Sequence, residues 1–153
     1  MNAEFVNPFI KASRDILVQM TGISSEMGSV YIKDKSFLMP NVVIMIGITG
    51  DFKGQAVVSM SEGIAFRIAS NMMGGLPVAA LDEITKSAIS ELGNMILGNA
   101  ATLLYNLNIK IDITPPTLLI GDKISISLAN MKTICIPLKT EFGIIELDIS
   151  TKE

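Results

Sequence analysis

The sequence predicts an α+β fold: a single domain over residues 1–153, with a largely antiparallel sheet of about six strands and one long helix packed on it. The 153 residues are the size of one ordinary domain, and 49% of them are apolar, so a sizeable core can form. Three segments show helical spacing of apolar residues, whereas the others are short β-branched runs separated by turn residues. The elements follow the order helix, three strands, two helices and four strands, which is typical of α+β proteins.

The first segment, which ends at Thr21-Gly22, is predicted to form an amphipathic helix of about 17 to 20 residues. Its apolar residues recur every three or four positions: Phe5, Phe9, Ala12, Ile16 and Met20. Asn2 or Asn7 is a candidate N-cap, because a short polar side chain can accept from the free N–H groups of the first turn. Pro8 favours a start close to it, since proline is best tolerated in a first turn.

Seven segments are predicted to be strands, because they are rich in β-branched residues or alternate between apolar and polar side chains. They cover residues 30–38, 42–49, 55–60, 117–120, 123–129, 131–138 and 143–149. Gly121-Asp122 is predicted to form a hairpin turn between two of them.

Two further helices are predicted between the two groups of strands. The first has Ser61 as its N-cap and ends at Gly74-Gly75. The second is longer, with Asp82 as its N-cap and an end near Leu107. Each start combines a capping side chain with an apolar stripe, which is the usual signature of a helix N-terminus.

Composition excludes several classes of function. The net charge is −3, and the 12 lysines and arginines are scattered singly, so nucleic-acid binding is not expected. The chain has no histidine and one cysteine, Cys135, which excludes a histidine base, a Ser-His or Cys-His pair and a zinc site built on these residues. Cys135 lies among alternating apolar residues, and a buried small side chain is a better interpretation than a reactive thiol. Any chemistry must then rest on carboxylates, amides, hydroxyls or the substrate's own groups.

No segment is expected to insert into a membrane or to direct secretion. The first twenty residues carry charges, and the longest apolar run covers only residues 42–48, far short of the roughly 20 residues that span a bilayer. The expected location is therefore the cytoplasm.

The long helix carries the most informative pattern. One face is apolar and is expected to be buried: Ile89, Leu92, Ile96, Ala100, Leu103 and Leu107. The opposite face presents polar or small residues at i, i+4, i+7 and i+11: Ser87, Glu91, Asn94 and Gly98. A hydroxyl, a carboxylate and an amide therefore stand in a row that a macromolecule could approach closely.

From these residues alone, an ordinary solvated helix face remains the stronger interpretation. Gly93 and Gly98 argue against it, because each glycine costs a helix about 1 kcal/mol relative to alanine, and both would favour close approach. Asn99 lies near the edge of the apolar stripe, so we expect a flanking amide that is hydrogen-bonded within the fold rather than a catalytic group.

The spacing Ser87-x3-Glu91-x2-Asn94-x21-Pro116 resembles the signature of the CheC, CheX and FliY phosphatases of bacterial chemotaxis. Glu-x2-Asn alone is common by chance, and the added serine and proline make the match specific. The likeness extends over essentially the whole chain. CheC-like members carry the motif twice, whereas this sequence carries it once, which is similar to CheX.

The resemblance implies a phosphatase that removes phosphate from the aspartyl phosphate of a CheY-like response-regulator receiver. It implies that Asn94 holds the attacking water, that Glu91 pairs with a cationic side chain of the receiver, and that Ser87 lies at the margin of the contact. Pro116 would be structural. No cofactor is expected on this chain, because the receiver would carry the magnesium ion. The resemblance also implies a homodimer that is joined through its sheets.

Two other classes of function stay open. One is a receiver-binding or flagellar-switch-associated module without turnover, although the presence of both Glu91 and Asn94 argues against it. The other is a structural subunit that uses its apolar edge strands only for assembly.

Overall fold

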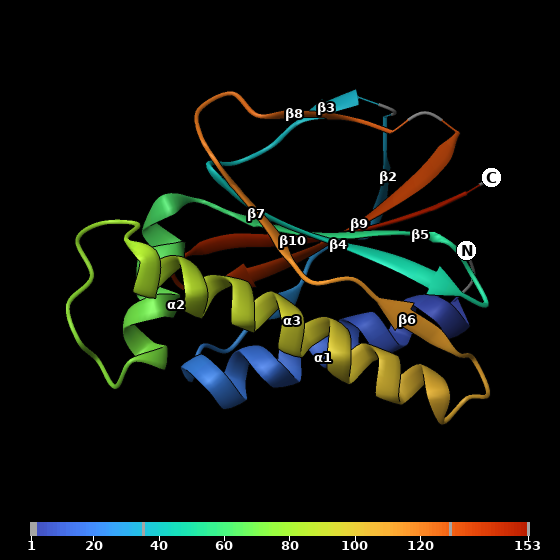
Figure 1. Ribbon diagram of the computed structural model, residues 1–153, viewed down its shortest axis with the longest axis horizontal. Helices are drawn as coiled ribbons and strands as arrows, with labels where there is room; N and C mark the ends of the chain where they lie inside the picture. Colours follow the sequence, from blue (N-terminus) through green and yellow to red (C-terminus); the bar gives the residue numbers. More distant parts are fainter. Residues whose placement is uncertain (1–2, 35, 129, 153) are drawn as a thin grey trace.

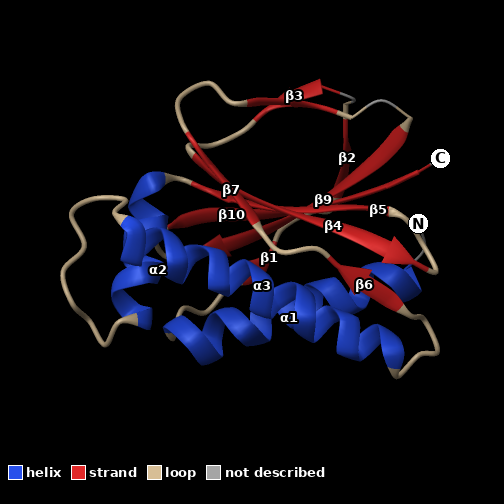
Figure 2. Cartoon of the chain, viewed as in Figure 1, coloured by secondary structure: helices blue, strands red, loops and turns tan. Residues whose placement is uncertain are grey.

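Three helices cover one face of an antiparallel sheet, and a small two-stranded ladder covers part of the other face (Figures 1 and 2). The computed structural model describes residues 3–34, 36–128 and 130–152. The helices are α1 (Ala3–Thr21), α2 (Glu62–Met72) and α3 (Glu83–Tyr105). The strands are β1 (Glu26–Met27), β2 (Tyr31–Lys33), β3 (Ser36–Leu38), β4 (Val42–Gly50), β5 (Gly54–Met60), β6 (Ile111–Ile113), β7 (Thr117–Ile120), β8 (Ser125–Ser127), β9 (Met131–Thr140) and β10 (Gly143–Lys152). In this part of the chain, no helix has the length and apolar composition needed to cross a membrane.

Within the described residues the main sheet has eight strands, but it is about six strands wide. β9, β10, β5 and β4 form its centre, and each pairs antiparallel with its neighbour. The short β1 and β2 share the outer edge of β9, and the short β6 and β7 share the outer edge of β4. The predicted fold class is therefore confirmed, and two of its edge positions are each divided between two short strands.

Several boundaries differ from the prediction. β1 and β6 were not predicted, because two or three residues are too few to show an alternating pattern. The segment 30–38 forms two strands, since β2 pairs with β9 whereas β3 pairs with β8 in a separate ladder. The segment 123–129 contributes only the three residues of β8, and Ala129 lies outside the described residues.

The predicted hairpin at Gly121-Asp122 is wrong, because the strands on either side of it do not pair with each other. β7 pairs with β4, and β8 pairs with β3. Asn41 holds the connection instead. Its side-chain amide donates to Asp122 Oδ1 at 3.0 Å, and its carbonyl accepts from the N–H of Gly121 at 3.1 Å.

α1 starts before the proline that was expected to mark its beginning. Asn7 lies inside the helix, so its prediction as N-cap is wrong, and Asn2 lies outside the described residues. Pro8 lacks an N–H and removes one helical hydrogen bond. The turn before it is held by packing, since the ring of Phe5 lies 5.3 Å from that of Phe52 in an edge-on contact.

The main core lies between the helices and the sheet face that they cover. Alternate residues of the central strands point into it, as the period of two requires. They include Ile44, Ile46 and Ile48 of β4, Val58 and Met60 of β5, Ile136 of β9, and Leu147 and Ile149 of β10. A smaller cluster on the other face packs under the β3–β8 ladder: Met39, Val43, Val57 and Ile126.

Gly93 sets how closely α3 lies on the sheet. It is buried, and a Cβ at this position would lie 2.8 Å from Cγ2 of Ile44 on β4. The close approach expected of this glycine is therefore made to the protein's own sheet. Gly98 differs, because a Cβ there would meet nothing within 4 Å.

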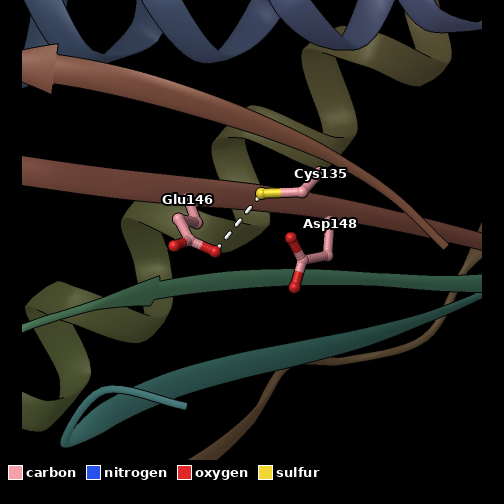
Figure 3. A group of neighbouring side chains, drawn as sticks. All are labelled: Cys135, Glu146 and Asp148. Atoms are coloured by element: carbon pink, nitrogen blue, oxygen red, sulfur yellow. Dashed lines mark hydrogen bonds between the residues drawn. The ribbon is translucent and has the colours of Figure 1, made fainter. Parts of the chain in front are cut away.

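The face of β9 and β10 that points away from the helices holds a group of buried polar side chains around Lys33. Its ammonium lies 2.7 Å from Glu146 Oε2 and 2.8 Å from Asp148 Oδ2. Asp148 is fully buried, and the thiol of Cys135 donates to Glu146 Oε2 at 3.2 Å (Figure 3). Two carboxylates from β10 therefore hold Lys33, which ties the short edge strand β2 to the sheet.

Each of four groups in this cluster has a raised pKa. The pKa of Tyr31 is raised to about 12, first by its hydrogen bond with Cys135 and then by burial. Burial also raises the pKa of the Cys135 thiol. Burial alone would lower the pKa of Lys33, but its hydrogen bonds to both carboxylates raise it overall. Burial also raises the pKa of Asp148, and the ammonium of Lys33 offsets only part of this increase. The folded protein thus holds protons to higher pH than the unfolded chain.

Replacing Gly93 with alanine should destabilise the protein. Ile44 is β-branched and its Cγ2 cannot swing away alone, so the clash should outweigh the better helix propensity of alanine. We expect Gly93→Ala to lower the free energy of unfolding by about 1–2 kcal/mol, measured by urea denaturation. Gly98→Ala is the matched control, because it adds the same methyl group in open space, and it should leave stability equal or slightly higher. Equal losses in both variants would contradict the assigned contact.

Stability should fall as the pH rises from about 9 toward about 12. The raised pKa values of Cys135, Tyr31 and Lys33 contribute stability that is fully present below the unfolded values of 9.0, 10.0 and 10.5. That stability is lost as the pH rises through the higher folded values. Tyr31→Phe should make the fall smaller, because phenylalanine has no hydroxyl to ionise. Urea denaturation across this range measures the slope, and a flat profile would contradict the cluster's role.

Candidate functional site

Helix α3 presents the candidate site, and its start is fixed as the sequence predicts. Asp82 caps it, since its carboxylate accepts from the N–H of Thr85 at 2.9 Å. α2 is capped in the same way by Ser61, whose hydroxyl accepts from the N–H of Ile64 at 3.3 Å. Both predicted caps are confirmed, and they fix where the turns of each helix fall.

Burial along α3 separates an inner face from an outer face. Ile89, Leu92 and Ile96 are buried as predicted. Leu103 is only partly buried, and Leu107 is 46% exposed because the helix ends at Tyr105. In place of Leu107, Ile109 returns to the core after the turn.

The structure places the four predicted row residues on the outer side of α3. Ser87 and Glu91 are exposed, and Asn94 and Gly98 are half-buried. We refer to Ser87, Glu91, Asn94 and Gly98 as the α3 row. Each member follows the previous one by three or four residues, so the row runs along about three turns of the helix.

The polar groups of the α3 row are not used by the fold. Within the described residues, the amide of Asn94, the carboxylate of Glu91 and the hydroxyl of Ser87 make no side-chain hydrogen bond or ion pair with the rest of the chain. An amide can position a water molecule, and a carboxylate can pair with a cation. The row therefore presents binding and positioning groups, with no histidine or thiol beside it to act as a base or nucleophile.

Pro116 lies close to Ser87 although the two are 29 positions apart in the sequence (116 − 87). Both line a groove of about 520 Å³ between the first turns of α3 and strand β7. We call it the α3–β7 groove; its lining residues are Glu83, Lys86, Ser87, Ser90, Pro116, Leu118 and Ile120. The structure thus brings Ser87 and Pro116 together, while Glu91 and Asn94 lie on the following turns of the same helix, outside the groove lining.

A clamp that the sequence did not reveal fixes the segment before Pro116. The hydroxyl of Thr114 accepts from the N–H of Gly47 at 2.8 Å, and the N–H of Thr114 donates to the carbonyl of Gly47 at 3.0 Å. A Cβ on Gly47 would lie 3.0 Å from Cγ2 of Thr114, so glycine leaves room for this approach. The pair holds the connection between β6 and β7 against β4. The sequence offers one indication of this contact, because an isolated glycine inside a predicted strand, here Gly47, often marks the close approach of another segment.

Asn99 differs in part from its prediction. It flanks the buried face and is half-buried, as expected. The expected hydrogen bond is absent, because its amide has no hydrogen-bond partner among the described residues.

The cluster around Lys33 was not predicted, and its acidic and thiol side chains make it a candidate metal site among the described residues. Donor atoms of Cys135, Glu146 and Asp148 lie within 4.8 Å of one another (Figure 3). A metal there would have to displace the ammonium of Lys33, which already contacts both carboxylates. The raised pKa of Cys135 also keeps the thiol protonated, whereas a metal ligand must be a thiolate. We therefore assign this cluster a structural role.

Comparisons with known proteins agree with the fold and identify a family. Residues 42–139 match the family model described as "Chemotaxis phosphatase CheX". The CheY-P phosphatase CheX of Thermotoga maritima is 36% identical over 126 residues, which are 82% of this chain and 81% of that protein.

Two solved structures are similar over nearly their full length. The chemotaxis protein CheX of Desulfovibrio desulfuricans has a TM-score of 0.89 and 28% identity, over 97% of this chain and 99% of that one. The CheX–CheY–BeF3–Mg²⁺ complex of Borrelia burgdorferi has a TM-score of 0.82 and 27% identity, over 97% of this chain and 98% of that one. From the sequence match, the shared fold and the single Glu91–Asn94 motif, we conclude that this chain belongs to the chemotaxis phosphatase CheX family.

Proposed function

We propose that this protein hydrolyses the aspartyl phosphate of a CheY-like response-regulator receiver, and that the α3 row is the surface that enters the receiver's site. Family membership supports the reaction, and the relative from Thermotoga maritima is a CheY-P phosphatase. The observation that carries the assignment of the site is the outward placement of Asn94 and Glu91, whose polar groups have no partner elsewhere in the described structure.

The chemistry explains why an amide is enough. Water attacks the phosphorus atom in line, and the bond between phosphorus and the aspartyl oxygen breaks. The leaving group is a carboxylate, which is stable as an anion and needs no general acid. In a loose phosphoryl transition state the attacking water has formed little of its bond to phosphorus, so a strong general base is not required. The main requirement is a water molecule held in line. In this proposal the water donates a hydrogen bond to the side-chain carbonyl oxygen of Asn94, which orients the water oxygen toward phosphorus.

The other row residues hold the partner. The carboxylate of Glu91, one turn before Asn94, pairs with a cationic side chain of the receiver, in this proposal its active-site lysine. Ser87 lies at the margin of the contact. Pro116 is a positioning residue that shapes the entry to β7, since proline has neither a donor nor a proton to transfer.

Magnesium enters this proposal through the partner. The related CheX from Borrelia burgdorferi was crystallised with CheY, BeF3 and Mg²⁺. On the receiver, such an ion would neutralise phosphoryl oxygens, and this chain would contribute the water-positioning amide and the cation-pairing carboxylate.

Phosphate release from an acetyl-phosphate-treated CheY-like receiver, with and without this protein, tests the proposed function. A rate well above the receiver's own dephosphorylation supports it. Binding without any acceleration, with several phosphorylated receivers, would instead identify a binding module without turnover.

Asn94→Ala and Glu91→Ala should fail in different ways. Asn94→Ala should lower kcat by about 100-fold or more and leave receiver binding nearly intact, because the amide acts chiefly as the transition state forms. Glu91→Ala should also weaken binding, by about tenfold, in a manner that depends on salt, because it removes one half of an ion pair. Steady-state kinetics and calorimetric titration separate the two effects.

Asn99→Ala is the matched control for Asn94→Ala. The two residues are both half-buried asparagines of α3, but they lie on different sides of the helix. Asn99→Ala should keep wild-type turnover. Loss of turnover in Asn99→Ala together with wild-type turnover in Asn94→Ala would contradict the assigned row.

We also propose a homodimer, as the family resemblance implies. The outer edge of β2 supports it, because this strand and the residue before it expose apolar side chains: Val30, Tyr31 and Ile32. An exposed apolar edge strand favours pairing with another chain unless it is protected.

Analytical ultracentrifugation should give a species of about twice the 16.4 kDa mass of one chain. Ile32→Glu should shift it toward the monomer, because it places a charge on the proposed edge contact. Leu76→Glu is the matched control, because Leu76 and Ile32 are each 61% exposed and Leu76 lies in the loop after α2. A single monomeric species across the micromolar range would contradict the dimer.

A further inference from the structure

The α3–β7 groove adjoins the α3 row, and apart from Ser87 and Pro116 its lining residues have no role in the mechanism proposed above. Ser87 belongs to both, so the groove begins where the row begins. Seven residues separate Ser87 from Asn94, which is about 10 Å along a helix at 1.5 Å per residue. The groove is therefore within reach of any protein whose phosphoryl group lies at Asn94.

The two walls of the groove differ in chemistry. The β7 wall is apolar, with Leu118 half-buried and Ile120 40% exposed. The helix wall is polar, and its Lys86 and Glu83 form an exposed ion pair at 3.5 Å. Such an exposed pair contributes little to stability. Lys86 or Glu83 can therefore form an ion pair with a charged group of another molecule instead. The groove matches an amphipathic segment that places apolar side chains on β7 and polar ones on the helix.

The size of a stable contact points to the same surface. A standard interface covers about 800 Å² on each partner, which corresponds to a patch with a radius of about 16 Å. Glu91 and Asn94 alone cover a small part of such a patch, so the contact must extend beyond them. The apolar β7 wall has the composition of an interface core, in which charged residues are depleted.

We infer that the α3–β7 groove receives a segment of the receiver next to its phosphorylation site and supplies affinity for the receiver rather than chemistry. This inference rests on the proposed phosphatase function. It adds Leu118, Ile120 and Lys86 to the residues that recognise the partner. Because the groove does not touch the phosphoryl group, its residues affect KM and leave kcat unchanged.

Ile120→Glu tests the inference, with Leu119→Glu as its matched control. The two residues are neighbours on β7 and have similar exposure, 40% and 37%, but successive side chains of a strand point to opposite faces, and only Ile120 lines the groove. Melting curves establish that both variants fold. With a phosphorylated CheY-like receiver, Ile120→Glu should raise KM by about tenfold or more with kcat unchanged, and Leu119→Glu should match the wild type.

Titration with a beryllofluoride-activated receiver in magnesium should show the same loss of affinity in Ile120→Glu. Three results would each overturn the groove inference. They are a wild-type KM in Ile120→Glu, equal losses of affinity in Ile120→Glu and Leu119→Glu, and a fall in kcat with unchanged KM in Ile120→Glu. These outcomes are distinct from failure of the proposed function, in which the wild-type protein itself would not accelerate phosphate release.

Discussion

The contact between Gly93 of α3 and Ile44 of β4 is the constraint on which the rest of the site depends. A helix can lie this close to a sheet only where it has no Cβ at the point of contact, since a Cβ would come within 2.8 Å of Ile44. With Gly93 against the sheet, the helical repeat leaves Glu91, Asn94 and Gly98 to point outward. The glycine that weakens the helix therefore fixes which of its faces is exposed.

The two faces of the sheet carry different kinds of interaction. One face buries apolar side chains against the three helices and so holds α3 in place. The other carries the β3–β8 ladder and the buried cluster in which Lys33 bridges Glu146 and Asp148. A buried ion pair of this kind adds little net stability. Loss of one partner, however, would leave the other charge buried without compensation, which destabilises the fold. The cluster therefore fixes the position of β2, far from the outer face of α3.

The parts of the fold that the sequence predicted are those with long periodic patterns. The three helices, the caps at Ser61 and Asp82 and the four central strands are all visible in spacing and β-branched composition. β1 has two residues and β6 has three, which is too short for a local pattern to indicate a strand. They form because they pair with the edges of β9 and β4. The failed hairpin at Gly121-Asp122 has the same cause, since Asn41, 80 residues earlier, holds that connection (121 − 41).

The site divides in the same way. Helical spacing and the family resemblance together selected Ser87, Glu91 and Asn94, whose roles stay a prediction. The structure places all three on the outer side of α3, with Ser87 and Glu91 exposed and Asn94 half-buried. The α3–β7 groove, the clamp between Gly47 and Thr114 and the cluster around Lys33 join residues that are distant in the sequence, so spacing could not reveal them. Gly93 and Gly98 looked alike in the sequence, and packing separates them into an internal contact and an open surface.

In the proposed complex, the outer face of α3 meets the phosphorylation site of a receiver. The most direct measurement is NMR mapping of this protein's backbone amides as a beryllofluoride-activated CheY-like receiver is added in magnesium. We expect the largest changes in chemical shift on α3 from Ser87 to Gly98 and on β7, with little change at Lys33 or Asp148. Large changes on the β3–β8 ladder or around Lys33, with α3 unaffected, would contradict the proposed complex.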